Sequence, residues 1–257
     1  MKIIVLVKEV PDTYGERKLD LETGLADRAA SEPVLDEIGE RALEVALSHA
    51  DKNEAEVVVM SMAPERAATT IRKGLAMGAA SAVQIADMGL AGADLGLTAR
   101  TLAAGIRKTG FDLVIAGNLS TDGSGGVLPA MLAELLEVPN LTALSTVEIA
   151  ADSVSGTRTT DDGTMSLSAP LPAVISITEA LPDARFPNFK GIMAAKKKPF
   201  ETLTTSDVGV DPQDLSVAAS IMTAITEKPP RSAGVKITDE GDGGTKIAEF
   251  LIENRLA

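Results

Sequence analysis

The chain has 257 residues, of which 45% are hydrophobic by type, and it carries 24 basic and 37 acidic side chains for a formal net charge of -13. This length and apolar content allow a sizeable core and exclude wholesale disorder, while the negative charge argues against nucleic acid or an anionic membrane as a partner. With no cysteine and a single histidine, His49, the chain alone cannot supply disulfides, thiolate nucleophiles or multi-histidine metal sites, so no metal site is expected.

The chain begins with MKIIVLVKEV, in which only five apolar residues separate Lys2 from Lys8. That run is too short for a signal-peptide core or a membrane-spanning helix, and no later run approaches the roughly 18 apolar residues that a span needs. We therefore expect a cytoplasmic protein without membrane insertion.

Short apolar runs in the first half of the chain predict β-strands. They are KIIVLV from Lys2, AEVVVMSMA from Ala55, SAVQIA from Ser81 and FDLVIAG from Phe111. Because these runs are rich in β-branched residues and do not alternate with polar ones, they are typical of parallel strands buried on both faces.

Helical patterns fill the intervals between these runs. Helices are expected around Ile38 to His49, Pro64 to Met77, Leu95 to Ile106, and Leu128 to Leu136. Gly78 stands where the second of them should end, and Pro139 follows the last. The alternation of strand and helix predicts an α/β fold, in which a parallel Rossmann-like sheet has helices on both faces.

The pattern changes after Leu141. LTALSTVEIA and TMSLSAPLPAVISIT flank the turn-rich DSVSGTRTTDDG, which predicts an antiparallel extension of the sheet. From residue 200 the periodicity is lost, with EKPPRSAG as a break and a final short helix near Ile247, Phe250 and Leu251. We expect residues 1–199 to form the α/β domain and residues 200–257 to form a C-terminal arm that packs on a partner subunit.

The segment GNLSTDGSGG, Gly117 to Gly126, is the candidate ligand site. It follows a predicted strand and leads into a helix, so its small residues would let backbone amides approach a phosphate at the helix start. Neither a GxGxxG fingerprint nor a Walker loop is present, and a flexible turn is the alternative interpretation.

Two other polar features favour structural roles. His49 lies on an apolar helical face, where a packed histidine is more common than a catalytic one. Asp161 and Asp162 are adjacent in a turn sequence and are typical of a solvated hairpin.

The segment FPNFKGIMAAKKKPF, residues 186–200, combines phenylalanines with the densest lysine run of an acidic, aromatic-poor chain. A core strand would not tolerate Lys196 to Lys198, and a solvated loop would not need Phe186 or Phe189. The segment is interpreted as a surface that meets another protein, with inward-facing phenylalanines as the alternative.

Five separated stretches resemble the electron transfer flavoprotein beta subunit. They are VLVKEVPDT near the start, TIRKGLAMGA from Thr70, LPAVISIT from Leu171, RFPNFKGIMAAKKKP from Arg185 and PPRSAGVK from Pro229. The resemblance covers nearly the whole chain and implies an adenine-nucleotide-binding fold. It also implies an electron carrier without substrate turnover, and therefore no catalytic residue.

The resemblance implies the following partners and cofactors. An alpha subunit would complete a heterodimer and hold the redox-active FAD, while this chain would hold a structural AMP. Electrons would come from soluble dehydrogenases, such as acyl-CoA dehydrogenases of fatty acid oxidation, and pass through a membrane quinone reductase towards the respiratory chain.

Carried over by position, the family's nucleotide contacts fall on three stretches before the glycine-rich loop and on that loop itself. They are Leu6, Asp36, Glu37, Ile38, Gly39, Met62, Gly117, Asn118, Leu119, Ser120, Thr121, Asp122, Gly123, Ser124, Gly125, Gly126, Val127 and Leu128. The first helix start departs from the family's usual Asn-Pro-Phe, and the loop is smaller. The pocket could therefore take AMP or, as in electron-bifurcating relatives, a second FAD.

The family's partner-recognition loop corresponds to residues 184–199 of this chain. Its apolar anchor falls on Phe189, with Ile192 and Met193 beside it, and Lys196 to Lys198 would hold the loop's base or guide the encounter. A nucleotide-binding enzyme of the ATP-pyrophosphatase type and a nucleotide-sensing stress protein are the alternatives.

Overall fold

The computed structural model describes residues 1–214, 216–217, 219–231, 233–234 and 236–256, and these form two compact units. The first unit, Met1–Thr223, contains the sheets and the cavity described below. The second unit, Ala224–Ala257, contains helix α6 (Gly243–Glu253), which confirms the helix expected near Ile247. Ser232, inside the expected break, lies outside the described residues.

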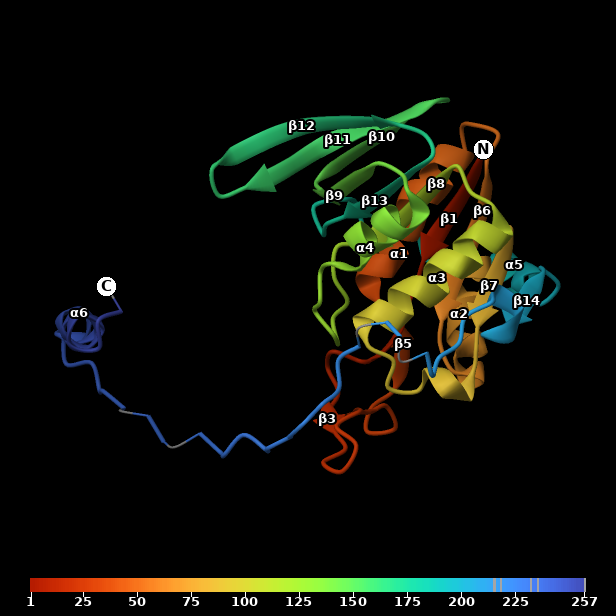
Figure 1. Ribbon diagram of the computed structural model, residues 1–257. Coiled ribbons are helices and arrows are strands. Elements are labelled where there is room, and N and C mark those ends of the chain that lie inside the picture. The colour runs from red at the N-terminus through yellow and green to blue at the C-terminus, as the bar shows by residue number, and fades with distance from the viewer. Residues whose placement is uncertain (215, 218, 232, 235, 257) are drawn as a thin grey trace. The chain divides into compact units, whose positions relative to one another are not determined.

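A parallel sheet forms the centre of the first unit (Figure 1). Within the described residues it has seven strands, in the order β14 (Phe200–Leu203), β7 (Ser81–Ile85), β6 (Glu56–Met62), β1 (Lys2–Leu6), β8 (Leu113–Gly117), β13 (Ala173–Ile177) and β9 (Asn140–Leu144). The strands predicted from apolar runs are confirmed and lie side by side as β7, β6, β1 and β8.

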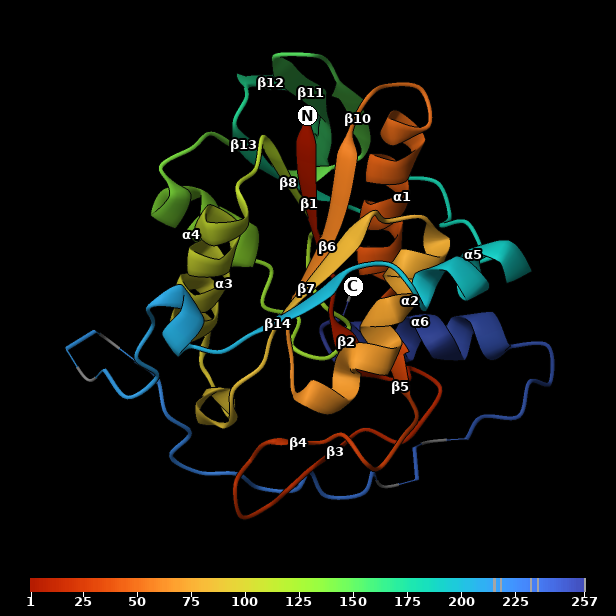
Figure 2. The same cartoon turned by 90° about the vertical axis from the view of Figure 1, so that its right-hand side faces the viewer.

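Helices cover both faces of this sheet, as Figure 2 shows. One face carries α1 (Glu37–Ala50) and α2 (Ala68–Met77), and the other carries α3 (Leu95–Thr109) and α4 (Leu128–Leu136). Alternate residues of β1 face the two helix layers. Ile3 and Val5 pack with α1 on one face of the sheet, while Ile4 and Leu6 pack on the face that carries α3 and α4. A strand buried on both faces must be apolar throughout, which is why its sequence does not alternate.

The expected helices are confirmed with small differences at their ends. The second begins with a 3₁₀ turn, η1 (Glu65–Ala67), before α2, and another turn, η2 (Met88–Leu90), precedes α3. Gly78 ends α2 with φ of 146°, a backbone conformation that favours glycine. Asp94 caps α3 by accepting a hydrogen bond from the Leu97 amide at 2.8 Å.

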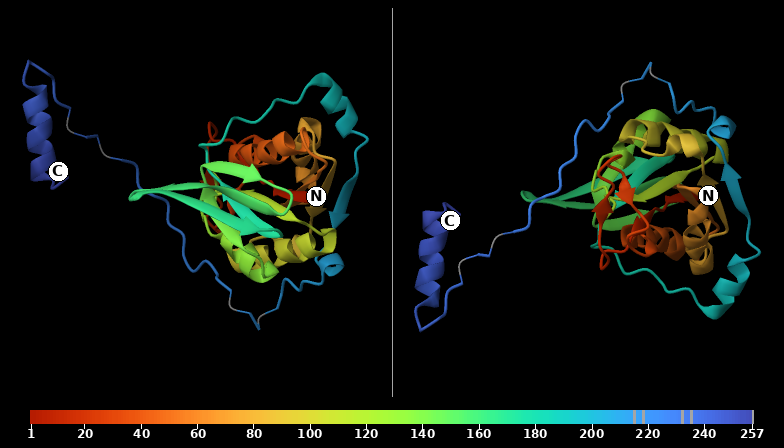
Figure 3. Two further views of the ribbon diagram at one scale, coloured as in Figure 1. Left: turned by 90° about the horizontal axis from the view of Figure 1, so that it is seen from above. Right: turned by 90° about the horizontal axis from the view of Figure 1, so that it is seen from below.

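The antiparallel extension is confirmed, but its strands differ from those expected. A separate sheet contains β10 (Thr146–Ile149), β11 (Ser153–Thr160) and β12 (Gly163–Pro170), and it lies against β9 (Figure 3). The segment interpreted as turns is therefore mostly β11, and only Asp161 and Asp162 form the hairpin turn. Residues 173–177, expected in the extension, instead form the parallel strand β13.

Residues 9–35 form an excursion that the sequence did not predict. Two short antiparallel pairs stabilise it, β2 (Glu9–Pro11) with β5 (Pro33–Leu35) and β3 (Lys18–Leu19) with β4 (Ala26–Asp27). These strands are only two or three residues long and β3 and β4 are exposed, so they leave no apolar periodicity in the sequence.

The boundary between the two units lies at 223/224, not at 199/200 as expected. Phe200–Leu203 pairs with β7 as the edge strand β14, and the 3₁₀ turn η3 (Ser206–Val208) follows it. A strand of four residues with two exposed side chains gives too weak a pattern for sequence analysis to detect.

Helix α5 (Phe189–Ala195) packs on α2 (Figure 2). The side chain of Arg72 donates to the Ala195 carbonyl at 3.1 Å, and its guanidinium lies 4.7 Å from the centroid of the Phe200 ring. Lys198 donates to the carbonyls of Leu75 and Ala79 at 3.0 and 2.6 Å, so this lysine supplies hydrogen bonds to carbonyl groups at the carboxyl end of α2. Lys198 therefore helps to hold the base of the segment that carries α5.

The chain before α5 is fixed by a charged contact with α1. The guanidinium of Arg185 donates two hydrogen bonds of 2.8 Å to the Glu44 carboxylate and a third, of 2.9 Å, to Asp51. Because these bonds favour the charged form, the pKa of Arg185 is raised above its ordinary value. Both ends of the segment that carries α5 are thus attached to helices of the sheet.

Replacing Gly191 with alanine is expected to displace α5. The added Cβ would lie 2.4 Å from the Ala76 carbonyl oxygen, and a backbone atom cannot move aside as a flexible side chain can. We expect the free energy of unfolding to fall by about 1–3 kcal/mol, measured by urea denaturation.

Gly96→Ala is the matched control for this variant. Its Cβ would meet side-chain atoms only at 3.4 Å or beyond, which is ordinary contact, and alanine favours the helix. Equal stability of the two variants would contradict the close approach of α5 to α2.

Candidate functional site

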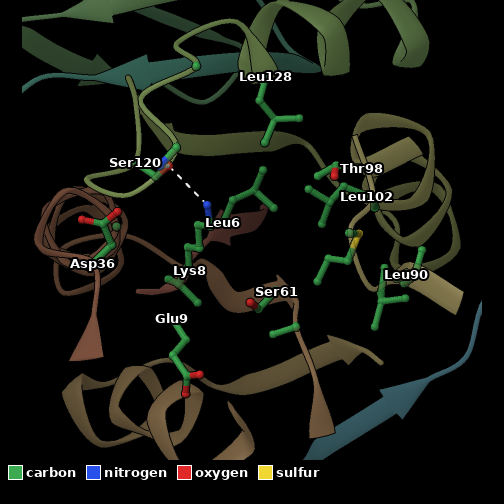
Figure 4. Close-up of a pocket in the computed structure, with 18 of the residues that line it drawn as sticks. Leu6, Lys8, Glu9, Asp36, Ser61, Leu90, Thr98, Leu102, Ser120 and Leu128 are labelled. Carbon is green, nitrogen blue, oxygen red and sulfur yellow. Dashed lines mark hydrogen bonds between the residues drawn. The ribbon is translucent and has the colours of Figure 1, made fainter. Parts of the chain in front are cut away.

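A cavity of about 970 Å³ lies at the carboxyl ends of the central strands (Figure 4). Ligand pockets of proteins span roughly 300–1,000 Å³, so this one is large enough for a nucleotide. Its wall is formed by the residues that follow β1, β6, β7 and β8, by the excursion and by α3.

The topology explains why a cavity forms here. Strands β1 and β8 are neighbours, but the chain leaves β1 towards α1 on one face and leaves β8 towards α4 on the other. The two connections therefore diverge beyond the strand ends, which creates the crevice where open α/β sheets bind ligands.

Most of the predicted nucleotide contacts lie in the wall of this cavity. They are Leu6, Asp36, Ile38, Gly39, Met62, Gly117, Asn118, Leu119, Ser120, Gly123, Gly125, Gly126 and Leu128. The others do not line the cavity, and they are Glu37, Thr121, Asp122, Ser124 and Val127.

The glycine-rich loop between β8 and α4 has a defined backbone. Gly126 has φ of 68° and Ser124 has φ of 50°, both in the left-handed region. An added Cβ on Gly117 would lie 2.5 Å from Ile38 Cγ2, so glycine is needed where α1 packs against the end of β8. The Thr121 amide donates to Asp36 Oδ2 at 3.0 Å, which attaches the loop to the start of α1.

Two cations and a loop carboxylate stand at the rim of the cavity. Lys8 Nζ lies 2.6 Å from Asp122 Oδ1 and 3.3 Å from Ser120 Oγ, and Arg28 Nη2 lies 3.3 Å from Asp122 Oδ2. Burial would raise the pKa of Asp122, but the hydrogen bond and the charge of Lys8 lower it to about 2. The carboxylate is therefore ionised at neutral pH and holds both cations.

Two buried polar atoms beside the cavity have no partner among the described residues. They are Asp36 Oδ1 and the Ser61 hydroxyl, and each residue lines the cavity with about 2% or less of its surface exposed. Burial raises the pKa of the Asp36 carboxyl, while the Thr121 amide acts in the opposite direction. Because an unpaired buried polar group is costly, both atoms fit a site completed by a polar ligand.

The far side of the cavity is apolar. Met60, Leu90 and Leu102 belong to the core cluster beneath α3, and Met62 packs against them. A wall of flexible methionine and leucine side chains suits a flat, weakly polar group such as a nucleobase. Polar groups on one side and apolar groups on the other match the two ends of a nucleotide.

Sequence reasoning missed Lys8, Arg28 and Ser61 in this wall. Lys8 and Ser61 each stand at the carboxyl end of a predicted strand, and that position was a usable signal. Arg28 reaches the site only because the unpredicted excursion folds back on the loop, so no local pattern indicated it.

The other polar candidates have structural surroundings. His49 is partly buried, the Asn53 amide lies 3.3 Å from its Nδ1, and burial lowers its pKa. This agrees with the packed histidine that the helical pattern favoured.

A second candidate surface is the outer side of α5. Phe186 and Phe189 are 92% and 80% exposed, while Ile192 and Met193 are each about half exposed. The alternative in which the phenylalanines face inward is therefore wrong. Several large apolar side chains exposed on one short segment are typical of an interaction site.

No helix in the described part of the chain is long and apolar enough to cross a membrane.

Comparison with known proteins identifies relatives over the whole chain. Residues 24–208 match the model of the electron transfer flavoprotein domain. The chain is 46% identical to the electron transfer flavoprotein subunit beta of Mycobacterium leprae (strain TN) and 47% identical to that of Mycobacterium tuberculosis (strain ATCC 25618 / H37Rv), in both cases over 99% of this chain and 98% of the relative.

A more distant relative is named as a subunit of a complex. The chain is 34% identical to a subunit of the caffeyl-CoA reductase-Etf complex of Acetobacterium woodii, over 98% of this chain and 97% of the relative. Since the domain model covers most of the chain and the beta subunits match it almost from end to end, the chain belongs to the electron transfer flavoprotein beta-subunit family.

Proposed function

We propose that this chain is an electron carrier subunit that binds AMP and docks dehydrogenases for a flavin held mainly by an alpha subunit. The observation that carries the proposal is the cavity at the ends of β1 and β8, where a glycine-rich loop faces an apolar wall. The FAD supplies the redox chemistry when bound, and this chain supplies the scaffold and the contact surface. We place the complex in the cytoplasm, serving acyl-CoA or other dehydrogenases and a membrane quinone reductase.

AMP suits the polarity of the cavity. Its phosphate would lie at the loop before α4, where helix amides and the helix dipole favour an anion. The sugar would lie near the unpaired oxygen of Asp36, and the base would pack against Met60 and Leu102. The cavity is also near the upper size limit for ligand pockets, so a second FAD is the competing occupant.

Docking is proposed for the outer side of α5. Burying one phenylalanine in a partner's pocket gives roughly 1.5–3 kcal/mol, which suits a contact that must form and dissociate in each cycle. Because Lys198 is engaged with the end of α2, any attraction of an acidic partner falls to Lys190, Lys196 and Lys197.

The second compact unit is proposed to pack on the alpha subunit. Its helix α6 exposes Ile247, Phe250 and Ile252, an apolar set that a solvated helix would not need. The alternatives of an ATP-pyrophosphatase and a stress protein are set aside, because the family is established and because β1 leads into Val7, Lys8 and Glu9 instead of a glycine-rich pyrophosphate loop.

Heat release of the bound nucleotide tests the occupant of the cavity. We expect the alpha–beta complex to release AMP, identified by mass, in an amount equal to the beta subunit, together with one FAD per complex. Two FAD molecules per complex and no AMP would contradict the proposal and favour the second-FAD alternative.

Phe189→Ala is expected to slow reduction of the flavin by the cognate dehydrogenase. Loss of one buried phenylalanine corresponds to about 10-fold or more in the second-order rate constant, measured by stopped-flow absorbance. The flavin content should not change, because Phe189 is proposed to contact the partner and not the cofactor.

Phe186→Ala is the matched control, since Phe186 is at least as exposed and lies three residues earlier, before α5. It should react at the wild-type rate. Equal rates for wild type and Phe189→Ala would refute the anchor role, and equal losses in both variants would point to a diffuse surface without one anchor.

A further inference from the structure

Lys8 stands where the chain leaves the central strand of the sheet and enters the cavity wall. Figure 4 shows its side chain rising between Asp36 and Ser61 towards Ser120 of the glycine-rich loop. Its side chain is 44% exposed, so the ammonium is accessible although it already has partners in the protein.

The hydrogen bonds of this ammonium leave capacity for a ligand. A lysine ammonium has three N–H donors. Among the described residues, its acceptors are Asp122 Oδ1 at 2.6 Å and Ser120 Oγ at 3.3 Å. The third donor remains for an acceptor in the cavity, and the other two fix the position of the nitrogen beside the loop.

Lys8 and Arg28 place two cations at the rim of the cavity, where they share one partner carboxylate, Asp122. The carboxylates of Glu9, Asp36, Glu65 and Asp87 also line the cavity, so its wall as a whole does not attract an anion. The chain as a whole carries -13, which would repel a phosphate from the solvent. A local cation is therefore needed in addition to loop amides if a phosphate is to bind firmly.

Arg28 is less suited to this role than Lys8. Its guanidinium donates to the Glu9 carbonyl at 3.2 Å and to Asp122 at 3.3 Å, so it fastens the excursion to the rim. Lys8 lies directly against the loop, through Ser120, and its side chain is the more exposed of the two.

We propose that Lys8 binds the phosphate of the nucleotide in this cavity through its third N–H, and that this contact selects a nucleoside monophosphate over the uncharged nucleoside. This inference rests on the proposed AMP site, because it assigns one end of that ligand. It adds Lys8 to the nucleotide contacts that the sequence analysis expected.

Calorimetric binding of AMP and of adenosine to the alpha–beta complex freed of nucleotide tests the proposal. Lys8→Gln should weaken AMP about 10- to 100-fold, the range for a hydrogen bond to a charged group, and leave adenosine affinity unchanged. Lys2→Gln is the matched control, since Lys2 begins the same strand at its opposite end and pairs with Glu56 at 3.5 Å. It removes the same charge and should leave both affinities unchanged.

The outcomes separate this inference from the proposed function. Wild-type complex that binds neither ligand overturns the nucleotide site and the inference with it. AMP binding that survives Lys8→Gln, or an equal loss for AMP and adenosine, overturns the inference alone.

A measurement on the wild type covers the case in which Lys8→Gln does not fold. The NMR signal of the assigned Lys8 ammonium should shift on addition of AMP and not on addition of adenosine. A signal that responds equally to both ligands overturns the proposal.

Discussion

The hydrogen bond from the Thr121 amide to Asp36 Oδ2 is the contact on which the cavity depends. It joins the loop after β8 to the start of α1, across the point where the chain leaves neighbouring strands for opposite faces of the sheet. Because Asp36 is almost completely buried, the bond is shielded from water and fixes the loop backbone before any ligand arrives. The cost is a carboxylate whose second oxygen has no partner in the part of the chain that the structure describes.

The cavity and the proposed docking helix are connected through α2. Glu9 lines the cavity, and its carboxylate accepts hydrogen bonds from Arg66 at 2.8 Å and from Thr70 at 2.7 Å, at the beginning of α2. At the other end of α2, Lys198 binds the last carbonyls and α5 packs closely at Gly191. One helix therefore holds the surface that carries Phe189 at a fixed position relative to the cavity.

The elements that sequence analysis predicted well are those whose burial is complete. β1 is apolar from Ile3 to Leu6 because both of its faces are covered there, and α1 and α3 each need a continuous apolar stripe. Strand β11 was mistaken for turns because it consists mainly of serine, threonine and glycine, and with Val154 as its one fully buried residue it shows no apolar alternation. Its Gly156 is explained only by pairing, since an added Cβ would lie 2.1 Å from the Thr146 carbonyl oxygen.

Sequence analysis could predict only the part of the candidate site that lies on one continuous segment of the chain. A glycine-rich loop between a strand and a helix has a local signature, and it was found. The charge cluster has none, because residues 8, 28 and 122 meet only after the excursion, the first strand and the loop have come together. Since Asp122 is held ionised by Lys8, while the pKa of the nearby Asp36 is raised by burial, neighbouring carboxylates differ for reasons that tertiary structure alone creates.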